Sequence, residues 1–270
     1  MKIISWNLRY SSKQSSFSRV DALRKLDWDL IALQEVSRNA WKVFVESGIF
    51  DEGYFPLESF GLRPPDYRVH GAAIIARNGY KISNPQLIPN IPKVERAIAA
   101  RVMNDGKEFT LVSWHAPNAS SEGVAVKMKG YQGITNYIGG LDGPIILGFD
   151  GNHWNKRIEL NPPDPTSEDD AFFTENVFYS NQPPHTLKDT YLTHLRNNKD
   201  QYQAIIQQRP DGPLAVSYVR KGISKTPIED RFDYIFATCD FIVNECKYLY
   251  DEGVASGSDH AIVLADLDWN

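Results

Sequence analysis

Several apolar segments of this chain end in, or lead directly into, residue types that bind metal ions or phosphate. These residues are amides, carboxylates and imidazoles: Asn7, Glu35, His115, Asp150, Asn152, Asp259 and His260. Carboxylates and amides provide the oxygen ligands that Mg²⁺ prefers, and imidazoles contact phosphate or move protons. Polar groups that converge at strand ends form a site rather than a core, so the pattern predicts a site for a metal ion and a phosphate.

Taken singly, each of these residues also has an ordinary structural explanation. Asn7 can end a turn, and Glu35 can be a solvated acid at the start of a helix. The segment 150–152 is a good turn sequence, and 258–260 can cap a helix or form a loop. The ordered succession of all of them along one chain favours the functional interpretation.

The fold class follows from the apolar pattern. Runs of strand length predict strands at 2–6, 30–35, 71–76, 97–102, 109–114, 144–147, 232–237 and 261–267. Helical spacing of apolar residues predicts helices over 20–26 and 124–138. Strands outnumber helices and their order is mixed, which predicts an α/β sandwich of two packed sheets with helices over their outer faces.

Composition bounds the remaining possibilities. The net charge of −5 argues against broad electrostatic binding to nucleic acid, although a local basic rim can still face a substrate. No apolar run approaches the ~20 residues of a membrane span, so no membrane insertion is expected. Two cysteines without an export signal predict a cytoplasmic protein. No linker or repeat divides the chain, so a single domain over 1–270 and a monomer are expected.

Other polar features of the sequence leave their role open. Proline-rich segments at 155–166 and 181–186 either line the site or are surface insertions. His153 and Trp154 either pack in the interior or touch a base or sugar, and His185 and His194 are expected at the surface. A phosphate-facing rim or a solvated basic loop is expected from a cluster of cations, Arg220, Lys221, Lys225 and Arg231.

The succession of motifs resembles the endonuclease/exonuclease/phosphatase superfamily over nearly the whole chain, from Lys2 to Leu267. The residues that carry the resemblance are Trp6-Asn7, Leu33-Gln34-Glu35, the GAAIIAR segment ending at Arg77, His115, Asp150 with Asn152, the RFDYIF segment 231–236, and Ser258-Asp259-His260. The resemblance implies a deoxyribonuclease-I-like four-layer sandwich, with two packed mixed β-sheets flanked by helices. It also implies a metal-dependent phosphoester hydrolase.

The resemblance implies a role for each carboxylate and amide near the metal. Glu35 is expected to be the principal ligand of a divalent ion, usually Mg²⁺ with Mn²⁺ as an alternative. Asn7 and Asp259 are expected nearby, in direct contact with the ion or joined to it through water. Hard oxygen donors of this kind suit Mg²⁺, which keeps several waters and shares the substrate phosphate.

A second group of residues is implied to act on the phosphate. Asp150 is expected to orient or deprotonate the attacking water, and Asn152 to bind a non-bridging oxygen. Asp233 is expected to hold His260 and fix its tautomer, while His260 and His115 contact the phosphate from two sides.

Within the superfamily, the motifs are most similar to those of the pancreatic-deoxyribonuclease-like branch, although two of them differ. His115 resembles the histidine of that branch, and Arg9 occupies a position that reaches the DNA backbone there. In that branch a carboxylate seven residues before Arg77 pairs with the histidine, and the same count gives His70 here, with Asp66 as the nearest replacement. The branch's G-D-x-N motif becomes G-F-D-G-N.

Three functions are weighed on this basis. The first is a nuclease that hydrolyses DNA or RNA phosphodiester bonds. The alternative is a phosphatase or phosphodiesterase that acts on a small or lipid phosphoester, since one fold hosts all of these activities. A non-catalytic binding module is disfavoured because the expected polar positions are all filled.

Overall fold

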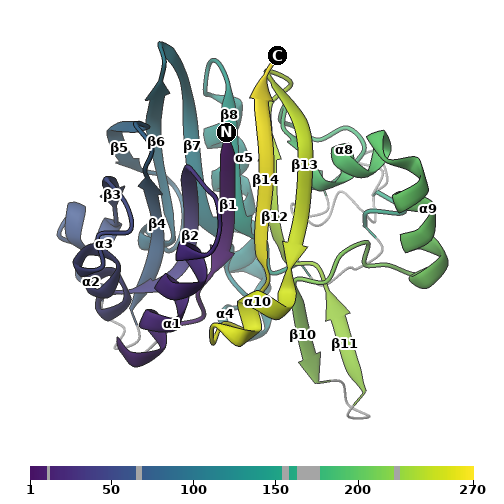
Figure 1. The fold of residues 1–270 in the computed structure, drawn as a ribbon, viewed down its shortest axis with the longest axis horizontal. Coiled ribbons are helices and arrows are strands. Elements are labelled where there is room, and N and C mark those ends of the chain that lie inside the picture. The colour runs from purple at the N-terminus through teal and green to yellow at the C-terminus, as the bar shows by residue number, and fades with distance from the viewer. Residues whose placement is uncertain (11–12, 65–68, 154–157, 163–176, 222–225) are drawn as a thin grey trace.

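Two mixed β-sheets pack face to face in the computed structural model (Figure 1), which describes residues 1–270 except 11–12, 65–68, 154–157, 163–176 and 222–225. Within the described residues, one six-stranded sheet has the order β13 (Phe241–Leu249), β14 (Ile262–Trp269), β1 (Lys2–Asn7), β2 (Leu30–Ser37), β4 (His70–Ala76) and β3 (Glu52–Tyr54). The other has the order β5 (Lys81–Leu87), β6 (Ala97–Asn104), β7 (Lys107–His115), β8 (Ile145–Asp150), β12 (Asp233–Ala237) and β9 (Lys188–Asp189).

Helices cover the outer faces of both sheets. On the first sheet, α1 (Lys13–Arg24) and α2 (Arg38–Glu46) share an apolar cluster with β1 and β2. On the second, α5 (Val124–Gly139) shares a cluster with β7 and β8. The remaining helices are α3 (Pro56–Ser59), η1 (Val94–Arg96), α4 (Ala119–Glu122), α8 (Thr190–Asn197), α9 (Lys199–Gln208) and α10 (Tyr250–Ala255). The predicted four-layer α/β sandwich is confirmed.

Alternation along each strand separates the layers. In β8, Ile146 packs in the cluster between the sheets, whereas its neighbour Leu147 packs in the cluster that includes α5. The sheets approach closely at Gly148, where a Cβ would lie 2.6 Å from the Cβ of Ala32. A larger residue at this position would push the two sheets apart, so glycine is required for the close contact.

All the predicted elements are present, and the additional strand β13 has weak periodicity. Strands form at all eight predicted places, and helices form at both. The first helix begins at Lys13 rather than Val20, so it includes part of the Ser-rich stretch. β13 was not predicted because its inward residues do not alternate regularly, and its pairing with β14 shifts register between Val243 and Glu245.

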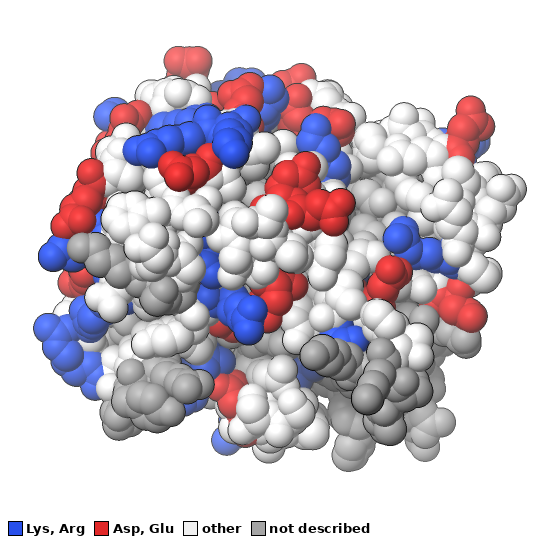
Figure 2. Space-filling model, turned by 60° about the horizontal axis from the view of Figure 1, so that its bottom comes forward, with Lys and Arg blue, Asp and Glu red and all other residues white. Residues whose placement is uncertain are grey.

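One rim of the sandwich carries a β-hairpin and a surface on which acidic and basic residues are interspersed. The hairpin of β10 (Tyr218–Lys221) and β11 (Pro227–Asp230) projects at the rim where β1 ends (Figure 1). Basic and acidic residues are interspersed on the face seen when this rim is turned toward the viewer (Figure 2). None of the helices in the described part of the chain combines the length and the apolar character needed to cross a bilayer.

Candidate active site

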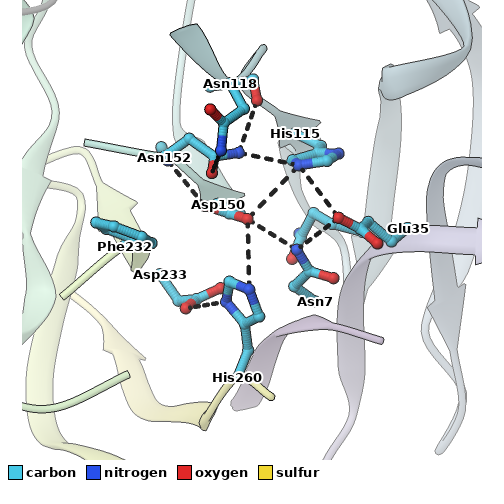
Figure 3. Close-up of polar contacts among 12 residues, drawn as sticks. Asn7, Glu35, His115, Asn118, Asp150, Asn152, Phe232, Asp233 and His260 are labelled. Carbon is cyan, nitrogen blue, oxygen red and sulfur yellow. Dashed lines mark hydrogen bonds and ion pairs between the residues drawn. The ribbon is translucent and has the colours of Figure 1, made fainter. Parts of the chain in front are cut away.

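Strand directions explain why the predicted polar residues meet at one rim (Figure 3). β1 runs parallel to β2 in one sheet, and β7 runs parallel to β8 in the other, so these four strands end at the same edge. β12 is antiparallel to β8 and β14 is antiparallel to β1, so both begin at that edge. Sequence-distant side chains from both sheets therefore lie within contact distance of each other.

The inward alternation of the core strands continues into the site. Along β1, Ile3 and Asn7 point to the space between the sheets, and along β8, Ile146 and Asp150 do the same. Strict alternation would turn Glu35 outward. A register shift in the pairing of β2 with β4 between Leu33 and Val36, together with a φ of 53° at Glu35, brings its carboxylate to the rim instead.

Asp150 is the centre of the constellation and is buried. Its Oδ2 accepts a 2.7 Å hydrogen bond from Asn7 Nδ2, and its Oδ1 accepts one of 2.8 Å from the Asn152 N–H. His115 Nε2 lies 3.6 Å and His260 Nε2 lies 4.0 Å from Oδ2. Burial and the nearby Asp233 carboxylate raise the pKa of Asp150 to about 7, which suits a group that exchanges a proton near neutral pH.

Asp233 and His260 form a buried pair beside Asp150. The distance from His260 Nδ1 to Asp233 Oδ2 is 2.8 Å, and both side chains are almost inaccessible. Burial lowers the pKa of His260, but the Asp233 and Asp150 carboxylates outweigh burial and raise it to about 10. The imidazole is therefore a cation at neutral pH, oriented with Nε2 toward the centre of the site.

His115 is held differently. Its Nε2 lies 3.0 Å from Asn152 Nδ2, which also donates a 2.9 Å hydrogen bond to Ala116 O. Burial lowers the pKa of His115 well below its ordinary value, so this ring is neutral. His70, which the sequence comparison put in the position of the usual carboxylate partner, lies beside His115, with ring centroids 5.6 Å apart. Asp66, the other candidate, lies outside the described residues.

Glu35 is a suitable oxygen donor for a divalent cation. Its Oε2 accepts a 2.8 Å hydrogen bond from the Tyr10 N–H, and its Oε1 lies 3.5 Å from Asn7 Nδ2. Burial raises its pKa, but the neighbouring imidazoles, when they carry a proton, and the Tyr10 N–H outweigh burial and lower it to about 2. The carboxylate is thus ionised, as a ligand of a divalent cation must be. Asn7 turns its amide nitrogen to Glu35 and its Oδ1 accepts the Arg9 N–H, and the partly exposed Asp259 carboxylate pairs with Arg9.

The comparisons with known proteins concern the fold of the chain. No protein-family model and no curated protein sequence matches the chain. Solved structures do match it over its whole length. An endonuclease/exonuclease/phosphatase from Bacteroides vulgatus aligns with a TM-score of 0.67 at 18% identity, covering 100% of this chain and 98% of that one. The chain has the endonuclease/exonuclease/phosphatase fold.

Two further structures with this endonuclease/exonuclease/phosphatase fold are similar over comparable lengths. TDP2 from D. rerio, complexed with a single strand DNA product, aligns with a TM-score of 0.68 at 16% identity and covers 99% of this chain and 98% of that one. The APE2 catalytic domain from Xenopus laevis aligns with a TM-score of 0.66 at 17% identity and covers 99% and 91%. At these identities the similarity concerns the fold.

Sequence reasoning missed two residues that support the site in this chain, Ser217 and Lys127. Ser217 Oγ accepts the Asp233 N–H at 3.1 Å, and Lys127 Nζ donates to Asn152 O at 2.8 Å. Ser217 lies in an irregular segment with no pattern to reveal it. Lys127 had a signal, because it is spaced with the core residues Tyr131 and Ile134 along the predicted helix and is buried like them.

Ser258 and Asn118 fix two further site elements. Ser258 Oγ donates to Asn7 O at 2.7 Å and so ties the segment before β14 to the end of β1. Asn118 caps α4 and donates to Asn152 Oδ1 at 3.3 Å.

The rim residue Arg9 is mostly exposed and pairs with Asp259, with 3.4 Å between Nε and Oδ2. Arg9 therefore lies beside Asp259, one of the residues predicted to lie near the metal.

One residue that was predicted at the rim, Arg231, is buried instead. Arg231 is buried and bonds to Glu159 and Asp189, each at 2.8 Å, so its placement in a basic rim or a solvated loop was wrong. A charge removed from water needs such partners, and they exist only in the folded core. Arg220 is partly exposed and pairs with the buried Asp230.

The remaining sequence assignments divide between packed and undescribed residues. His153 packs against Tyr179 with ring centroids 5.0 Å apart, in agreement with an interior position. His194 is buried beside Gln201 and Asn198, so its predicted surface position was wrong. His185 is half-buried. Trp154 and Lys225 lie outside the described residues, and of Lys221 only the backbone is described.

Proposed function

We propose that this protein is a divalent-metal-dependent phosphodiesterase, and specifically a nuclease that hydrolyses DNA or RNA. One observation carries the proposal. Asp150 is buried at the centre of the rim, hydrogen-bonded to Asn7, with two imidazoles within 4.0 Å and the ionised Glu35 carboxylate beside them. Buried charges are costly, and a cluster of this composition is retained where it binds and transforms an anionic substrate.

Asp150 is proposed as the group that orients the attacking water and accepts its proton. Its pKa of about 7 lets it be ionised before attack and take up a proton during attack. The Asn7 amide and the Asn152 N–H hold both carboxylate oxygens, so the acid is oriented before substrate arrives. Asn152 then provides the amide for a non-bridging phosphate oxygen.

His260 is proposed to stabilise the negative charge that develops on the phosphate. Asp233 keeps the imidazole protonated at neutral pH and fixes Nδ1, which leaves Nε2–H directed into the site. Removing one preorganised donor of this kind typically lowers the rate about 10²–10³-fold. His115 is neutral and contributes a second imidazole on the opposite side of Asp150.

Glu35, with Asn7 and Asp259 nearby, would hold the divalent ion, Mg²⁺ or Mn²⁺. When bound, such an ion neutralises charge on the phosphate and on the leaving oxygen. Glu35 is suited to this role because it is ionised and only partly buried, with one face toward the rim. Removing its charge without changing its size should therefore abolish metal-dependent turnover and leave the fold intact.

A nucleic acid is favoured as the substrate by two observations. The D. rerio TDP2 structure, which has the same fold, holds a single strand DNA product. In this chain, Arg9 is exposed at the mouth of the site, where a phosphate next to the scissile bond would pass. Because acidic and basic residues are interspersed on this face (Figure 2), binding is expected to depend on local contacts rather than on a broad positive surface.

The test is a substrate panel with matched variants. Plasmid DNA, single-stranded DNA, RNA and a small phosphomonoester are each incubated with Mg²⁺ or Mn²⁺ and with wild type, Asp150→Asn or Asp142→Asn. Asp142 is an exposed acid and serves as the control. Wild type and the control should cleave at least one nucleic acid, and Asp150→Asn should not. Turnover of the phosphomonoester alone, or full activity in EDTA, would overturn the proposal.

A further inference from the structure

A second group of metal-binding side chains surrounds the Glu35 carboxylate. Glu35, His70 and His115 each offer one ligand atom, and these atoms all lie within 4.8 Å of one another. The distance from Glu35 Oε1 to His115 Nε2 is 3.6 Å. The carboxylate proposed to hold the catalytic ion thus has two imidazole nitrogens close to it in addition to the oxygen donors.

The fold places these residues together from both sheets. His70 opens β4 and pairs with Ser37, immediately beyond the register shift that turns Glu35 toward the rim. His115 ends β7 in the opposite sheet, and its ring is tilted by 39° to that of His70. His115 is buried, with no hydrogen-bond partner for Nδ1 among the described residues, so its neutral form can carry a proton there and leave Nε2 free to coordinate.

The donor geometry is compatible with an ion after small side-chain movements. Imidazole and carboxylate ligands lie about 2.1 Å from Zn²⁺, which puts neighbouring donors about 3–4 Å apart. The Asn152 amide, now beside His115 Nε2, also donates to Ala116 O at 2.9 Å and keeps that acceptor when the imidazole turns to an ion. His260 is bound to Asp233 and does not compete for this position.

We propose that Glu35, His70 and His115 form a nitrogen-containing site that prefers divalent ions such as Co²⁺ or Zn²⁺ over Mg²⁺. Imidazole is a good ligand for these ions, whereas Mg²⁺ prefers oxygen donors and retains its water. This inference rests on the proposed function and deepens it by naming the class of ion. In this arrangement His115 binds the ion, and His260 is the imidazole that contacts phosphate.

The first experiment measures Co²⁺ binding to the metal-free protein by visible absorption, without any substrate. His70→Gln is compared with wild type and with His185→Gln, a control histidine that is half-buried like His70. His70→Gln should weaken Co²⁺ binding about 10-fold or more, while Mg²⁺ binding measured by calorimetry changes little. The control should bind both ions as wild type does. Equal Co²⁺ affinity of His70→Gln and wild type would overturn the proposal.

A second measurement uses only wild type and so does not depend on a variant folding. In the Co²⁺-loaded protein, two exchangeable imidazole N–H protons should show paramagnetically shifted proton resonances. Absence of these resonances in a Co²⁺-loaded sample would mean that oxygen ligands alone hold the ion, and would refute the site. Loss of nucleic-acid hydrolysis with both resonances present would contradict the proposed nuclease function and leave the metal site standing.

Discussion

The buried pair of Asp233 and His260 offers the sharpest test of the proposed chemistry. Asp233→Asn keeps the size of the side chain and removes its charge, and His260→Ala removes the imidazole. Because the Oδ2 to Nδ1 distance is 2.8 Å and both groups are buried, the carboxylate is the principal reason that the imidazole is protonated and oriented. Either change should therefore disable the same function.

The expected magnitude follows from this coupling. Loss of one preorganised charge-stabilising donor costs about 2.7–4 kcal/mol of transition-state stabilisation, or about 10²–10³-fold in rate. Independent effects of that size would multiply to about 10⁴–10⁶-fold in the double variant. If the two residues act as a unit, the double variant should lose little more than His260→Ala alone.

The assay compares the turnover of five proteins on one nucleic-acid substrate at saturating metal: wild type, each single variant of the pair, the double variant and His194→Ala. His194 is a buried, hydrogen-bonded histidine on α8, away from the rim, and controls for general effects of removing such a residue. It should retain wild-type turnover. Fully multiplicative losses for Asp233 and His260 would refute the pair, and so would an unaffected rate in Asp233→Asn.

Three further predictions concern the metal, the turn after Asp150 and the core. Glu35→Gln should lose most metal-dependent turnover while its circular dichroism spectrum stays unchanged. EDTA should abolish the turnover of wild type until Mn²⁺ is added back. A fully active Glu35→Gln variant would exclude Glu35 as the main ligand. Gly151→Ala should lower both turnover and melting temperature, at a cost of about 1–3 kcal/mol, because its Cβ would overlap the Tyr179 hydroxyl. Tyr179→Phe should restore part of both, and no recovery would count against this overlap. Arg231→Met should lower the free energy of unfolding in urea by about 3–5 kcal/mol, because it leaves two buried carboxylates without a cation. The control Arg209→Met, which removes an exposed ion pair, should lower it by about 0–1 kcal/mol. Equal losses would contradict the buried network.

The sequence by itself determined the strands and the residue types at their ends. An apolar run of strand length has few alternatives, and its period of two assigns each side chain to one face. For Asn7, His115 and Asp150 this reasoning leads directly to the inner face at the rim. The fold class was predictable for the same reason, since mixed strands with apolar faces on both sides require a second sheet and covering helices.

Only the tertiary structure decided which groups touch. Asn7 and Asp150 are separated by 143 residues and meet through one 2.7 Å hydrogen bond between the two sheets. Glu35 reaches the rim through a bulge, although strict alternation would turn it outward. The sequence alone suggests that Arg231 is a surface cation, whereas the structure buries it between Glu159 and Asp189. Local periodicity assigns a face to a side chain, whereas its neighbours on that face depend on strand pairing and sheet packing over long distances in sequence, and these contacts set the burial, charge and pKa of every group in the site.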